Sequence, residues 1–100
     1  MKPDDVRKSY EAAWNRLIDL VEQRNKLLRT LGAMAQFAGD FTPDTAMFME
    51  FDFDKAQEIL VQVQEMTPPI YAAIEEVNGY REQIGKPKIT RPTPPTLDVW

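Results

Sequence analysis

Residues 56–84 read AQEILVQVQEMTPPIYAAIEEVNGYREQI, and this stretch decides the fold. Apolar residues recur at every seventh position and at the positions beside them, a period typical of an α-helix that packs lengthwise on another helix. We therefore predict an all-α fold in which this stretch forms one arm of a helical pair. The recurring positions are Ala56, Val63, Ile70, Val77 and Ile84.

The pair Pro68-Pro69 lies in the middle of this arm. Two consecutive prolines remove two backbone N–H donors and push the residue before each of them away from the α conformation. The seven-residue apolar repeat nevertheless continues in phase beyond the two prolines. We therefore predict that a helix ends near Met66 and a third helix starts at Pro69, so that the arm is kinked or broken there without reversing direction.

The first arm is predicted between Pro3, followed by two aspartates suited to a helix start, and Ala38. Its apolar residues form two adjacent seams, which together are wider than one partner helix can cover. We therefore predict a long antiparallel hairpin that dimerises, as a homodimer, into a four-helix bundle. The seams contain Tyr10, Ala13, Trp14, Leu17, Leu20, Val21, Leu27, Leu28, Leu31, Met34, Ala35 and Ala38.

The connector between the arms is rich in aromatic residues. All five phenylalanines lie between residues 37 and 53, and Asp52 or Asp54 is placed to cap the second arm. Two interpretations stay open, since these side chains could plug the end of the bundle or form a partner-binding patch. The candidate partner-binding residues here are Phe41, Met47, Phe48, Phe51 and Phe53.

Residues 85–100 contain four prolines and have no helical period, so we predict a helical domain over 1–84 and an extended, Pro-rich tail over 85–100. Leu97, Val99 and Trp100 give this tail an apolar group that is costly to leave in water. It either folds back onto its own helices or docks on another protein, and we assign these three residues as candidate partner-binding residues.

Composition excludes several function classes. Cysteine and histidine are absent, which removes thiolate nucleophiles, soft metal ligands and the usual neutral-pH acid–base group. Residues 40–84 carry ten acidic and two basic side chains, a balance unfavourable for nucleic-acid binding. No apolar run approaches the length of a membrane span, so we expect a cytoplasmic protein.

Carboxylates offer one enzymatic alternative. Asp19 and Glu22 have the i,i+3 spacing found in the Mg²⁺-binding helices of all-α nucleotide hydrolases, but a matching second pair is missing. The acidic residues of the connector, including Asp52 and Asp54, lack the alternating ligands of a calcium loop. We therefore expect no metal, no cofactor and no catalytic residue.

The sequence thus predicts a non-enzymatic interaction protein, namely a small adaptor, a chaperone-like subunit or an inhibitor. It would present an acidic helical surface and a docking tail to a protein partner. The alternatives are a Mg²⁺- or Mn²⁺-dependent nucleotide hydrolase built on carboxylates, and an amphipathic protein that coats a lipid or polymer surface.

Overall fold

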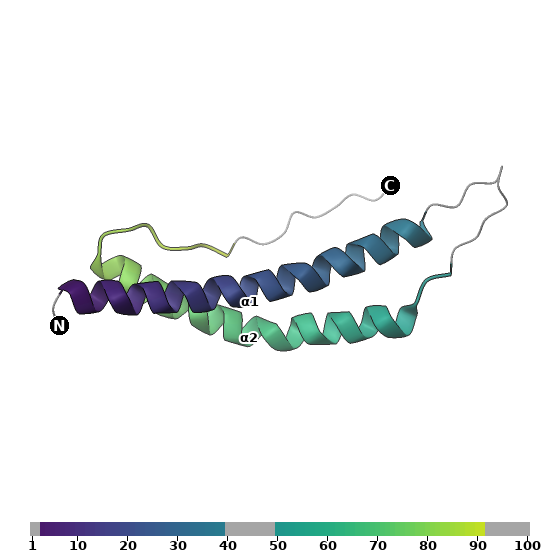
Figure 1. Cartoon of the computed structure of the whole chain (residues 1–100), viewed down its shortest axis with the longest axis horizontal. Helices are drawn as coiled ribbons and strands as arrows, with labels where there is room; N and C mark the ends of the chain where they lie inside the picture. The colour runs from purple at the N-terminus through teal and green to yellow at the C-terminus, as the bar shows by residue number, and fades with distance from the viewer. Residues whose placement is uncertain (1–2, 40–49, 92–100) are drawn as a thin grey trace.

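Two long helices make up the protein in the computed structural model, which describes residues 3–39 and 50–91. Helix α1 spans Pro3–Ala38 and helix α2 spans Phe53–Gln83. Figure 1 shows them lying side by side and running in opposite directions, in a molecule of 67 × 26 × 19 Å. No strand occurs in the described ranges. The predicted all-α helical hairpin is confirmed.

Local sequence accounts for the helix ends. α1 begins at Pro3 and carries Asp4 and Asp5 in its first turn, where carboxylates interact favourably with the positive end of the helix dipole. α2 is capped by Asp52, whose side chain accepts a hydrogen bond from the Lys55 backbone N–H at 2.9 Å. This bond satisfies one of the unpaired donors of the first turn.

The predicted break at Pro68-Pro69 is wrong, because α2 is one helix that includes both prolines. The missing N–H groups leave the carbonyls of Gln64 and Glu65 without their usual partners, but both residues are exposed and water can solvate these groups. Thr67 adds a side-chain hydrogen bond to the Val63 carbonyl at 3.0 Å. Burial of the apolar residues that follow the prolines holds the helix in phase across them.

The core is concentrated between the N-terminal half of α1 and the C-terminal half of α2. Val77 is fully buried there and is surrounded by partly buried aromatic and aliphatic side chains. Ala56 and Ile59 are also buried nearer the start of α2. The helices therefore pack along their length, and the main cluster consists of Ala13, Leu17, Ile70, Ala73, Ile74 and Val77.

The chain reverses direction after α2 at Gly85. This residue has φ of +75°, a left-handed conformation that glycine adopts without strain. The Lys86 N–H bonds the Arg81 carbonyl at 2.9 Å and closes the turn. Figure 1 shows the following segment running back beside the two helices. We refer to residues 86–91 as the strap.

Candidate interaction surface

The strap is held on α2 chiefly by one side-chain amide. The Asn78 side chain donates to the Ile89 carbonyl at 3.0 Å and accepts from the Ile89 N–H at 2.7 Å. The amide thus satisfies both polar groups of one strap residue, as a neighbouring β-strand would. The Ile89 side chain packs against the core cluster. Asn78 and Ile89 together fix the position of the strap on the helix.

Arg81 links the strap to both helices. Its Nε donates to the Pro87 carbonyl at 2.7 Å, and its Nη1 donates to the Tyr10 hydroxyl at 3.1 Å. The guanidinium carbon also lies 5.6 Å from the ring centre of Trp14, within cation–π range. One side chain of α2 therefore contacts α1 and the strap at the same time, which joins the three segments at this end of the hairpin.

The charge of the strap complements that of α2. Lys88 lies 3.7 Å from a carboxylate oxygen of Glu82, and the Arg91 guanidinium lies 4.2 Å from the ring centre of Tyr71. On the side of α1, Arg16 pairs with Glu76 at 3.1 Å. Part of the predicted acidic surface is thus paired within the chain.

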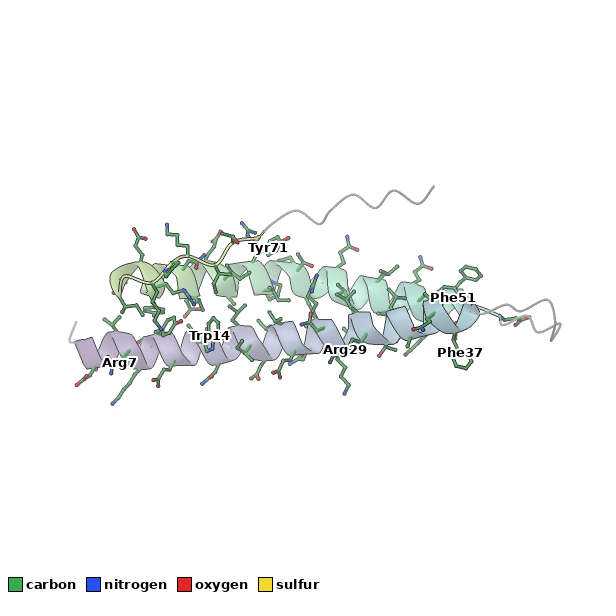
Figure 2. The ribbon with its side chains drawn as sticks, turned by 90° about the horizontal axis from the view of Figure 1, so that it is seen from above. Arg7, Trp14, Arg29, Phe37, Phe51 and Tyr71 are labelled. Atoms are coloured by element: carbon green, nitrogen blue, oxygen red, sulfur yellow. The ribbon has the colours of Figure 1, made fainter. Side chains whose placement is uncertain are left out.

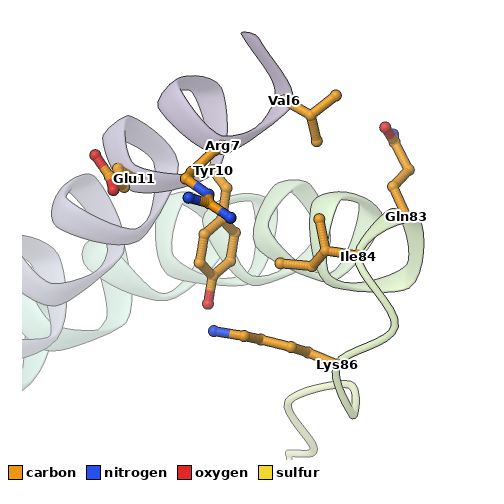
Figure 3. Close-up of a pocket in the computed structure, with 7 residues that line it drawn as sticks. All are labelled: Val6, Arg7, Tyr10, Glu11, Gln83, Ile84 and Lys86. Carbon is orange, nitrogen blue, oxygen red and sulfur yellow. The ribbon is translucent and has the colours of Figure 1, made fainter. Parts of the chain in front are cut away.

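A hollow of about 640 Å³ lies where α1 begins and α2 ends. Figure 3 shows Tyr10 projecting into it with Lys86 across from its hydroxyl, while Glu11 points away. The Lys86 ammonium lies 5.3 Å from the Tyr10 ring centre. The turn into the strap forms one wall, so the hollow is a product of the strap's path. Its lining residues are Val6, Arg7, Tyr10, Glu11, Gln83, Ile84 and Lys86.

The opposite end of the hairpin carries exposed aromatic side chains. Phe51 and Phe53 form an edge-to-face pair with ring centres 5.1 Å apart. Phe51 also lines a hollow with Met34 and Phe37 from the end of α1. Figure 2 shows Phe37 near the end of α1 and Phe51 just before the start of α2. Phe37 is 65% exposed and Phe53 is 75% exposed, so these two rings do not act as a plug.

One face of α2 joins this aromatic end to the strap. Leu60 lies eighteen residues before Asn78, which is five helical turns, and Phe53 lies about seven turns before it. Tyr71 falls on the same side. We call these four residues the strap face of α2. Leu60 is 52% exposed, and this face therefore changes from strap-covered to exposed and apolar along its length.

The candidate residues from the sequence fall into two groups. Of the connector residues, the structure describes Phe51, which is half-buried, and Phe53, which is exposed. Phe41, Met47, Phe48, Leu97, Val99 and Trp100 lie outside the described residues, so their roles stay predictions.

Two other chemical features can be checked in the same ranges. Within residues 3–39 and 50–91, no group of three or more acidic side chains is placed to hold a metal ion. Asp19 and Glu22 are both exposed on α1. Neither helix of the described part of the chain has the length and apolarity needed to cross a membrane.

Sequence reasoning missed Asn78, Arg81 and Ile89. Asn78-Gly79 stands out as an interruption in a helical pattern, but no local rule indicates that its amide bonds a segment eleven residues later. The only available signal for this attachment was that basic residues of the strap follow an acidic helix.

Comparison with protein-family models, curated proteins and solved structures found no match to this chain.

Proposed function

We propose that this protein is a non-enzymatic helical interaction protein, an adaptor, chaperone-like subunit or inhibitor, that self-associates through the exposed part of its strap face. Two copies would pair these faces and form a four-helix bundle as a homodimer. Its location in the cytoplasm stays a prediction from composition.

The observation that carries the proposal is the exposure of Phe53 and Leu60, the two most exposed large apolar side chains of α2. Side chains of this size are usually buried in a monomer, and an exposed group of them is typical of interaction sites. The neighbouring Phe37 and Phe51 extend the apolar surface around the end of the hairpin.

The available area suits a modest interface. A phenylalanine side chain can bury about 150–250 Å², so Phe37 at 65% exposure and Phe53 at 75% exposure offer roughly 210–350 Å² together. A standard interface buries about 800 Å² per partner, much of it polar at the rim. Leu60 and the surrounding glutamine and glutamate side chains can supply much of the remainder. The exposed rings would form the apolar centre of such an interface.

Light scattering on a sizing column tests the proposal. The full chain should give twice its mass of 11.5 kDa at high concentration. Phe53→Ser combined with Leu60→Ser should lower the dimer fraction at least tenfold. Val61→Ser is the matched control, because Val61 is 44% exposed but lies about a quarter-turn away from the strap face. The proposal is contradicted if the full chain and a chain that stops after Arg91 are both monomeric at every concentration, or if the double variant dimerises normally.

A further inference from the structure

We propose that residues 92–100 continue the path of the strap in the same chain and lay Leu97 and Trp100 on Leu60 and Phe53. This segment would then cover the surface assigned to self-association. The proposed docking involves a single chain, whereas its effect on self-association rests on the proposed function.

The direction of the strap supports this path. Pro87 contacts Arg81, Ile89 contacts Asn78, and Arg91 contacts Tyr71. Strap residues that follow one another therefore meet helix residues progressively nearer the start of α2. Figure 2 shows the strap passing along α2 as far as the region of Tyr71. A continuation in the same direction leads along the strap face toward Leu60.

The length of the segment fits the distance. The prolines at 92, 94 and 95 favour a polyproline II backbone, which rises about 3.1 Å per residue. Leu97 is eight residues beyond Ile89, about 25 Å, which corresponds to about 16–17 residues of α-helix. Counted back from Asn78, this distance reaches within a turn of Leu60. The same count for Trp100 reaches within a turn of Phe53.

The spacing of the two apolar pairs also agrees. With three residues per turn, a polyproline II segment places Leu97 and Trp100 on one side, about 9 Å apart along its axis. Leu60 and Phe53 are seven residues apart on one side of α2, which is about 10.5 Å. Asp98 would then point away from the helix. Contact between these pairs removes two exposed apolar side chains of α2 from water.

Engineered disulfides test the docking directly, since the chain contains no cysteine. Leu60→Cys combined with Leu97→Cys should form an intramolecular disulfide at least fivefold faster than Val61→Cys combined with Leu97→Cys. Both helix positions are exposed, so neither pair disturbs the core. Mass spectrometry of the oxidised protein distinguishes bonds within a chain from bonds between chains. Equal rates, or a bond formed only between chains, overturn the proposal.

A chain that stops after Arg91 tests the regulatory effect separately. It keeps the strap, and its dimer dissociation constant should be at least tenfold lower than that of the full chain. An unchanged dissociation constant shows that residues 92–100 do not cover the self-association surface and overturns this part of the proposal. If both chains stay monomeric, the proposed function fails, while the disulfide rates still decide whether the segment docks on α2.

Discussion

Replacing Asn78 with alanine should detach the strap while leaving the helical hairpin folded. The Asn78 amide makes both hydrogen bonds to the Ile89 backbone, and alanine can make neither. Alanine also favours a helix more than asparagine does, so α2 itself should not be weakened. The substitution therefore separates attachment of the strap from stability of the helices.

The two hydrogen bonds set the expected size of the effect. Each contributes a net free energy of about 0.5–1.5 kcal/mol, so their loss costs about 1–3 kcal/mol of strap attachment. Since about 1.4 kcal/mol corresponds to a tenfold change in an equilibrium constant, the detached population should rise roughly 5-fold to 150-fold. The contacts of Arg81 with Pro87 and of Arg91 with Tyr71 remain and keep part of the strap in place.

Limited trypsin digestion measures the detached population. Lys86 and Arg91 each precede a proline and resist trypsin, so the Lys88–Ile89 bond is the one cleavable site in the strap. Cleavage follows the equilibrium population of the open form when opening and closing are fast. Asn15→Ala, an equal change on the exposed side of α1, is the matched control. If Asn78→Ala leaves the rate at Lys88 unchanged, the amide does not hold the strap.

Three further variants test the fold. Val77→Ala should lower the unfolding free energy by about 1–3 kcal/mol and reduce the melting temperature in circular dichroism, whereas the exposed Val61→Ala should change it by less than about 0.5 kcal/mol. Pro68→Ala with Pro69→Ala should raise the melting temperature, since an interior proline costs about 3 kcal/mol; a fall would favour a required break. Arg16→Ala should change stability by less than about 1 kcal/mol in urea titration, because its ion pair with Glu76 is exposed.

Helix positions were predictable from local sequence because local physics sets them. Each of the signals used depends on residues within a few helical turns. These signals are the seven-residue repeat through Val77, the helix cap at Asp52 and the helix start at Pro3. Pro68-Pro69 misled the same reasoning. Their local cost favours a break, but burial of Ile70 against α1, a contact between residues far apart in sequence, outweighs it.

The attachment of the strap could not be predicted in the same way. Its main contact joins Asn78 to a backbone group beyond a turn at Gly85, and Arg81 reaches Tyr10 across 71 positions of sequence. Such hydrogen bonds form only when three segments of the chain come together, and the spacing of apolar residues in the sequence does not predict them. The sequence indicated only that residues 85–100 are not helical and that they carry basic and apolar groups suited to a helical surface.

The strap face of α2 and the segment that follows α2 both change from polar to apolar with distance from the turn at Gly85. Near the turn at Gly85, α2 offers an amide at Asn78, which suits the polar backbone of the strap. Further along, α2 offers Leu60 and Phe53, while the chain beyond Arg91 changes from prolines and threonines to an apolar group. A two-helix hairpin leaves the side of each helix uncovered wherever a third element is absent. Polar groups meet where the contact of the strap is described, and apolar residues follow in both sequences at matching distances. The proposed docking of residues 92–100 would therefore extend the described contact along the same face of α2.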